Sequence, residues 1–138
     1  MTFKIRVALS LCLALLLAAA WYFYPADKIH GQPVVCADIT KGCAADGWLI
    51  RFDRRPQMIK PFGIVAQLPD AQEAHIRFAM NGMEMGLNRY RLLPRADGAW
   101  TAEVILPICV RGRRDWLMQL ELTTTKGATY YQLPFTTP

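Results

Sequence analysis

From residue 34 onward, apolar and polar residues alternate in short stretches that are separated by Pro, Gly and Asp. Successive side chains of a strand point to opposite faces, so this alternation is typical of antiparallel strands that bury one face and expose the other. Asp97-Gly98 and Lys126-Gly127 are turn-forming pairs between such stretches. The alternation therefore predicts about seven strands, at 48–52, 62–68, 76–80, 90–92, 100–106, 116–122 and 131–135.

The number and spacing of these strands indicate the class of fold. No convincing helical stretch follows residue 25, and short strands separated by turns are typical of sandwiches and barrels. We expect residues 34–138 to form an all-β domain, an immunoglobulin-like antiparallel β-sandwich, with a small barrel as the alternative. Trp100 and Trp116 lie on the apolar faces of different strands, so we expect both to point inward from opposing strands.

The beginning of the chain shows a different pattern, a continuous apolar run without alternation. The run 7–24 is almost wholly apolar, and Lys4 and Arg6 precede it. A run of this length is at the short end of what crosses a membrane as a helix, and Lys and Arg favour the cytoplasmic side. The pattern predicts a membrane anchor at 1–25, consisting of one transmembrane helix, and a polar spacer at 26–33.

The same segment has a second interpretation, a signal peptide that is removed after export. Ala18-Ala19-Ala20 offers small residues for cleavage, whereas the aromatic residues at 21–24 favour an uncleaved anchor. Both interpretations place the β-domain outside the cytoplasm. We therefore expect a single-pass protein of a bacterial-type inner membrane, held in the membrane by residues 7–24, with its C-terminal domain in the periplasm.

Composition and charge narrow the classes of function. The chain has 138 residues, of which 53% are hydrophobic, and this leaves room for one domain with a core and excludes a disordered chain. The formal net charge of +5 is spread thinly, and Arg51, Arg54 and Arg55 form the nearest approach to a cluster. A solvated sheet edge explains such a cluster, so we expect no nucleic-acid partner.

Three cysteines, Cys36, Cys43 and Cys109, follow the N-terminal segment. An oxidising compartment favours pairing, and an odd number leaves one cysteine over. Cys36 and Cys43 enclose a short loop around Gly42, so we expect a disulfide between them. Cys109 is then left as either a buried free thiol or a ligand for a soft metal ion.

Three methionines, Met80, Met83 and Met85, lie close together in a stretch that also contains Gly and Asn. A core would more naturally use Leu or Ile, because methionine specifies packing poorly, whereas thioethers are good ligands for Cu(I). On an extended chain Met83 and Met85 share a face. We therefore expect a Cu(I) site made by Met83, Met85 and Cys109, with Met80 and His75 as further candidate ligands. Binding of a partner protein is the alternative use of the methionines.

The sequence shows no arrangement of residues that would support catalysis. His30 and His75 have no Cys or Asp at a ligand-like spacing, and no nucleophile elbow, Gly-rich phosphate loop or pair of carboxylates is present. Glu84 and Asp115 are better explained as ion-pair partners of nearby arginines. We therefore expect a protein that is not an enzyme.

Several blocks of the sequence resemble the FixH-like and YtkA-like domains of small exported bacterial proteins. In those domains an N-terminal anchor or signal is followed by a Cys-containing segment, a Met-x-Met-Gly-x-Asn-Arg block, a Leu-Pro-x-Cys block and a Trp-bearing strand. The corresponding blocks occur here in the same order within residues 36–135, at 83–92, 98–102, 106–109 and 113–116. The resemblance implies an immunoglobulin-like domain that handles copper or assists the assembly of copper-containing oxidases. This sequence lacks the histidine that many copper carriers place beside their methionines, which argues against a high-affinity Cu(II) site.

Two functions follow from these observations. The first is a membrane-anchored periplasmic module that binds Cu(I) or assists the assembly of a copper-containing membrane enzyme. The second is a non-metal structural or interaction subunit of a membrane-protein complex, whose methionine-rich loop meets its partner.

Overall fold

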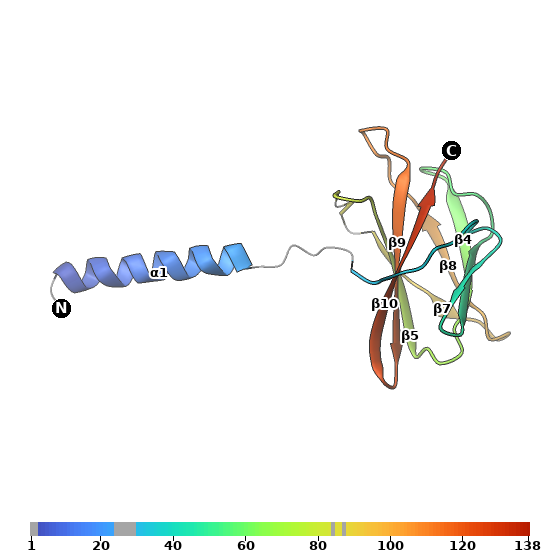
Figure 1. Cartoon of the computed structure of the whole chain (residues 1–138), viewed down its shortest axis with the longest axis horizontal. Helices are drawn as coiled ribbons and strands as arrows, with labels where there is room; N and C mark the ends of the chain where they lie inside the picture. The colour runs from blue at the N-terminus through green and yellow to red at the C-terminus, as the bar shows by residue number, and fades with distance from the viewer. Residues whose placement is uncertain (1–2, 24–29, 84, 87) are drawn as a thin grey trace.

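The computed structural model describes residues 3–23, 30–83, 85, 86 and 88–138, which form an N-terminal helix and a β-domain (Figure 1). Residue 24 of the expected apolar run and residues 26–29 of the expected spacer lie outside the described residues. The elements are α1 (Phe3–Phe23), β1 (Gln32–Pro33), β2 (Cys43–Ala45), β3 (Trp48–Phe52), β4 (Pro61–Gln67), β5 (Glu73–Ala79), β6 (Arg89–Arg91), β7 (Leu93–Pro94), β8 (Trp100–Ile105), β9 (Asp115–Thr124) and β10 (Gly127–Thr136).

The strands form two sheets of five strands each, which lie against one another as two layers (Figure 1). One sheet has the order β1-β10-β9-β5-β6, and the other has the order β2-β3-β4-β8-β7. Neighbouring strands pair antiparallel, except that β1 runs parallel to β10. The predicted mostly β fold is therefore confirmed as two sheets.

The short strand β1 lies along the outer edge of β10, within the segment expected to be a spacer. Just beyond β1, the amide of Val34 donates to the carbonyl oxygen of Gln132 at 2.8 Å. Gly31 allows this close approach, because a Cβ atom there would lie 2.9 Å from the backbone of Tyr130. A strand of two residues is too short to show alternation, so the sequence pattern did not reveal it.

The core lies between the two sheets, and the predicted alternation identifies most of it. One face of β3, β4, β5 and β9 is buried along almost its whole length, and β10 buries one face from Tyr131 onward. Aromatic rings join the sheets, since the ring centroid of Phe52 lies 5.3 Å from that of Phe135 and the centroids of Phe62 and Phe78 are 6.3 Å apart. Among the described residues, all side chains of the core come after residue 30, and none belongs to α1.

The burial of the tryptophans differs in part from the prediction. Trp116 is 1% exposed and points into the core from β9, as expected. Trp100 begins β8 and is only half-buried, because its neighbour β7 is an edge strand of two residues that covers little of it. The deeply buried tryptophan of this second sheet is Trp48 of β3, which is 3% exposed.

The strand expected at 90–92 largely corresponds to β6, and the chain crosses to the other sheet directly after it. β6 pairs with β5, whereas β7 pairs with β8 in the other sheet. Arg89 points outward and forms an ion pair with Glu121 at 2.9 Å. Tyr90 points the other way, and its hydroxyl donates to the carbonyl oxygen of Ile105 at 2.8 Å. This bond connects the two sheets at the point where the chain crosses between them.

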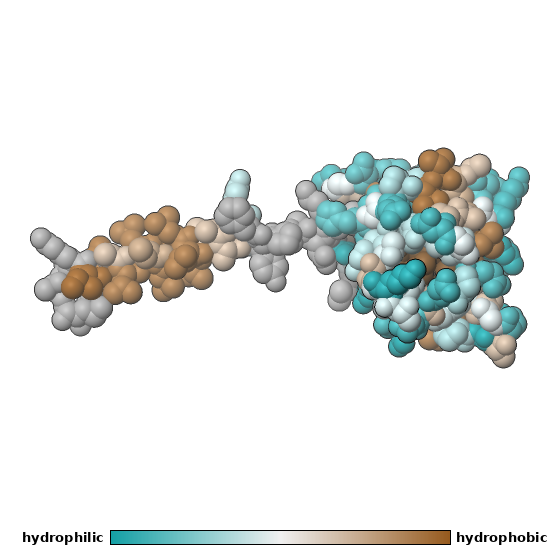
Figure 2. Space-filling view, turned by 60° about the horizontal axis from the view of Figure 1, so that its bottom comes forward, coloured by the Kyte–Doolittle hydropathy of each residue, from teal (hydrophilic) through white to brown (hydrophobic). Residues whose placement is uncertain are grey.

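The helix α1 carries apolar side chains around its whole circumference, and Figure 2 shows a mostly hydrophobic surface along it. Leu9, Leu16 and Trp21 are 55%, 68% and 86% exposed. By length and apolarity, no helix in the described part of the chain qualifies as one that crosses a membrane, so the structure does not support the predicted transmembrane helix.

Candidate functional site

Loops of both sheets meet at one end of the β-domain. β5 ends where β9 begins, since Ala79 pairs with Leu117, and β8 ends where β4 begins, since Pro61 pairs with Ile105. The ring contact between β4 and β5 sets these ends of the two sheets level with one another. We call this region the sulfur end, and it consists of the described residues within 36–40, 53–60, 80–88 and 106–114.

Most sulfur-containing side chains of the described β-domain lie at this end. They are Cys36, Met58, Met80, Met83, Met85 and Cys109. Cys43 begins β2 and is level with Ile50 and Ala66, so it lies farther from this end. Met118 is buried on β9 opposite Phe78, one residue inside the end of β5. The fold thus brings the expected ligands Met83, Met85 and Cys109 and the further candidate Met80 to the same end. It also adds Met58, which no pattern in the sequence singled out.

His75, the other candidate ligand, lies away from the sulfur end. It is in the middle of β5 on the outward face, where its Nε2 atom is 3.7 Å from Oε1 of Glu73. Its neighbours Ala74 and Ile76 point into the core. The sheet therefore separates the imidazole from the sulfur atoms, and the structure does not bring His75 to the expected site.

The methionine stretch begins with a tight hairpin. Met80 and Met83 pair across the turn, since the amide of Met83 donates to the carbonyl of Met80 at 2.9 Å and the reverse bond is 3.3 Å. Asn81 and Gly82 make this turn, and Gly82 adopts a φ of 72°, which favours glycine. The prediction assumed an extended chain through these methionines, but the chain reverses its direction between Met80 and Met83. Met80 is a cross-strand partner of Met83 and lies deeper, at 2% exposed, while Met85 is half-buried against the core.

Cys109 lies in the loop between β8 and β9 and is 5% exposed. The amide of Gly112 donates to its carbonyl oxygen at 3.0 Å and closes a turn. Ile108 and Val110, on either side, point outward and are 58% and 96% exposed. The loop therefore presents apolar side chains to the outside while it directs the thiol of Cys109 into the core.

Arg113 connects the cysteine loop to the methionine hairpin. Its Nη1 donates to the carbonyl oxygen of Asn81 at 2.9 Å, and the rest of its guanidinium binds both carboxylate oxygens of Asp115. The hydrogen bonds from Arg113 hold the pKa of Asp115 below its usual value. One side chain thus joins the two loops that carry the expected ligands.

Replacing Arg113 by Ala should loosen this connection without unfolding the domain. We expect faster hydrogen exchange at the amides of Met83 and Gly112, because both turns lose their common anchor, and little change in the core strands. Hydrogen exchange measured by mass spectrometry would test this. The control is Arg54→Ala, which removes an exposed ion pair with Asp53 in another loop of the sulfur end and should leave exchange at Met83 unchanged. Equal exchange at Met83 in the wild type and in Arg113→Ala would contradict the assigned role of Arg113.

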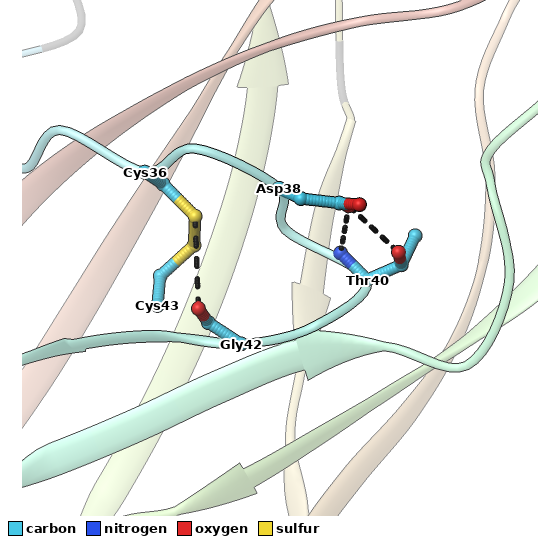
Figure 3. The surroundings of a disulfide bond; sticks show 5 residues. All are labelled: Cys36, Asp38, Thr40, Gly42 and Cys43. Carbon is cyan, nitrogen blue, oxygen red and sulfur yellow. Dashed lines mark hydrogen bonds between the residues drawn. A yellow bond between two sulfur atoms is a disulfide. The ribbon is translucent and has the colours of Figure 1, made fainter.

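The expected disulfide joins Cys36 to Cys43, with their Cα atoms 5.5 Å apart (Figure 3). Between them, a carboxylate oxygen of Asp38 accepts hydrogen bonds from the hydroxyl of Thr40 at 2.6 Å and from its amide at 3.0 Å. These bonds hold the pKa of Asp38 below its usual value. The prediction of this disulfide is confirmed, and Cys109 is left as the free thiol of the described β-domain.

A groove with a volume of about 650 Å³ opens beside the disulfide loop. Its walls include Asp38, Arg55, Asn81, Asp115 and Thr137, so it reaches from the disulfide loop past the methionine hairpin to the end of β10. The acidic side chains in the wall are already engaged, Asp38 by Thr40 and Asp115 by Arg113. The groove gives solvent a path to the sulfur end.

Comparisons with known proteins add little to this geometry. No family model matches the chain. No curated protein matches it either. Among solved structures, the crystal structure of an engineered protein determined by the Northeast Structural Genomics Consortium is similar, with 14% sequence identity and a TM-score of 0.48. The match covers 69% of this chain and 21% of the engineered protein.

Proposed function

We propose that the β-domain binds one Cu(I) ion at the sulfur end, with Met83, Met85 and Cys109 as ligands and Met80 as a further thioether. The observation that carries this proposal is the meeting of two separate loops, 80–88 and 106–114. One loop supplies three methionines, and the other supplies the free thiol of the described β-domain.

The chemistry of the donor atoms selects the metal. Thioethers and thiolates are soft ligands, which favour Cu(I) over borderline Zn(II). Within the described residues, no group of three or more His, Cys, Asp and Glu side chains could hold a metal ion. The usual ligand sets for Zn(II), Ca(II) and Mg(II) are therefore missing from that part of the chain. We regard Cu(I) as a cargo that the domain holds and passes on.

The order of the strands supports an immunoglobulin-like sandwich. In that fold the strands A, B, E and D form one sheet, and C, F and G form the other. Here β3-β4-β8-β7 follows the first order and β5-β9-β10 follows the second. This correspondence agrees with the resemblance to FixH-like and YtkA-like domains.

The disulfide supports export, because disulfides persist in oxidising compartments such as the periplasm. The apolar side chains of α1 support a role of the N-terminal segment in targeting, either as an anchor at 7–24 or as a signal that is removed. On this proposal the domain faces the periplasm, where it supplies Cu(I) to a copper-containing membrane enzyme during its assembly.

One observation favours a second function, that of an interaction subunit without metal. Ile108 and Val110 expose apolar surface next to Arg111, which is also exposed. Contiguous exposed apolar residues are typical of protein–protein interfaces. In this alternative the loop between β8 and β9 docks on a membrane-protein complex, and Cys109 serves only as a buried residue.

A competition titration against a Cu(I) chelator tests the proposal. The full-length chain in detergent would carry Cys12→Ser, so that the thiol of α1 cannot bind copper, and would be kept anaerobic. We expect one Cu(I) per chain and no stoichiometric Zn(II). Cys109→Ser should weaken binding most, by roughly 100-fold, because it removes the anionic ligand and leaves a hard oxygen. Met83→Leu and Met85→Leu should each weaken it by roughly 10-fold with nearly unchanged stability, since the swap conserves volume.

The matched control is Met118→Leu, the same chemical change at a fully buried core position on β9 that is not among the proposed ligands. Its affinity for Cu(I) should equal that of the wild type. Mass spectrometry should show that the disulfide between Cys36 and Cys43 is intact during the titration, so that these sulfur atoms do not compete. If the wild type and Cys109→Ser compete equally poorly with the chelator, the copper proposal is abandoned in favour of the interaction subunit.

A further inference from the structure

Asn88 is a buried amide without a partner at the sulfur end. Its side chain is 6% exposed, and neither Oδ1 nor Nδ2 has a hydrogen-bond partner among the described residues. A buried amide that gives up its bonds to water and gains none in return destabilises the fold, so such groups are nearly always paired. A leucine would fill the same space without this penalty, and the presence of Asn therefore calls for a functional explanation.

The register of the strands places this amide between the two sheets at the sulfur end. The backbone carbonyl of Asn88 accepts a hydrogen bond from the amide of Phe78 at 3.2 Å, so Asn88 continues the pairing of β6 with β5. Alternation puts Asn88 on the same face as Tyr90, whose hydroxyl reaches Ile105 at the end of β8. Asn88 lies one step nearer to the sulfur end. Its side chain therefore points between the two sheets, on the side of Tyr90 that is nearer to the sulfur end.

We propose that Asn88 is a positioning residue of the copper site, and that its Nδ2–H donates a hydrogen bond to the sulfur of Cys109 when this sulfur is a copper-bound thiolate. The inference rests on the proposed function. Among the described residues the structure supplies a buried donor without a partner and, at the same end of the domain, a free thiol that is 5% exposed. Hydrogen bonds from neighbouring groups orient metal ligands and tune the affinity of the site.

This role explains why an unfavourable burial persists in the fold. The metal-free chain contains an unpaired amide, whereas the loaded chain pairs that amide with a negatively charged sulfur. Binding of Cu(I) thereby gives the buried amide of Asn88 the hydrogen bond that it lacks in the metal-free chain. A residue of purely structural importance would show the opposite signature, because its removal would destabilise the metal-free chain.

Two measurements on Asn88→Leu, in the full-length Cys12→Ser chain, separate these roles. The substitution keeps the branched shape and the number of side-chain heavy atoms and replaces both polar atoms by methyl groups. We expect the melting temperature of the metal-free protein to rise, as followed by near-UV circular dichroism. We expect the Cu(I) dissociation constant to increase by about 10–100-fold in the chelator competition.

The matched control is Tyr90→Phe, which removes a polar atom from the same face two residues away. This hydroxyl has a partner in Ile105, so its loss should lower the melting temperature and leave the affinity for Cu(I) unchanged. A lower melting temperature in metal-free Asn88→Leu, or an unchanged affinity for Cu(I), would overturn the positioning role and leave the copper function standing. A wild-type chain that binds no Cu(I) would overturn both, so the wild-type titration distinguishes the two failures.

Discussion

Replacing Trp116 by Ala is expected to lower the free energy of unfolding by about 3–5 kcal/mol. Trp116 is 1% exposed and stacks on Phe135, with their ring centroids 6.5 Å apart and their planes at 17°. Truncation removes this contact and leaves a cavity between the sheets that close packing cannot fill. Urea unfolding followed by circular dichroism would measure the loss.

Trp100→Ala is the matched control, because the same atoms are removed from a half-buried position at the edge of the core. Trp100→Ala should lower the free energy of unfolding by about 1–2 kcal/mol, because folding buries less apolar area of this side chain than of Trp116. Equal losses in the two variants would mean that the difference in burial between β8 and β9 is not present in solution.

Removal of the disulfide should have the second-largest effect on stability. Cys36→Ala with Cys43→Ala is expected to lower the free energy of unfolding by about 2–3 kcal/mol, because the bond restricts the unfolded chain around a short loop. Urea unfolding with and without reductant would measure this loss.

Reductant should shift the wild-type transition to that of the double variant and should leave the double variant unchanged. Cys109→Ala provides the control, because this thiol forms no disulfide and its variant should keep the sensitivity to reductant. A wild-type transition that does not respond to a reductant able to reach the bond would contradict the stabilising role of the disulfide.

Most of the longer strands could be predicted from the sequence because one face of each is buried over several successive turns of the alternation. Trp116 and Leu133 belong to such regularly alternating stretches, in β9 and in the second half of β10. The strands β1, β2 and β7 have two or three residues and leave no periodic pattern. The prediction for Trp100 was only partly right, because its exposure depends on the length of a neighbouring strand that the residues around Trp100 do not encode.

The candidate site could be predicted only in part. The softness of the methionines and the spacing of Cys36 and Cys43 are local properties, and the disulfide is confirmed. The hydrogen bond from Arg113 to Asn81, which joins the methionine hairpin to the loop of Cys109, depends on the order of strands in both sheets, which periodicity does not determine. His75 was a candidate because of its side chain alone, and the outward face of β5 keeps it apart. The unpaired amide of Asn88 is a property of the packed structure.

The parallel strand β1 has a consequence for the behaviour of the protein in concentrated solution. The carbonyl of Gln132 accepts from Val34 at the outer edge of β10, so alternate backbone groups of β10 point away from β9. The next outward residue is Pro134, which has no N–H to offer. The outer edge of β10 is thus covered by β1 at Gln132 and has no N–H donor at Pro134. Such an edge is a poor template for pairing with a strand of another copy. Two residues of β1 and one proline thus help to protect a ten-residue edge strand from edge-to-edge aggregation.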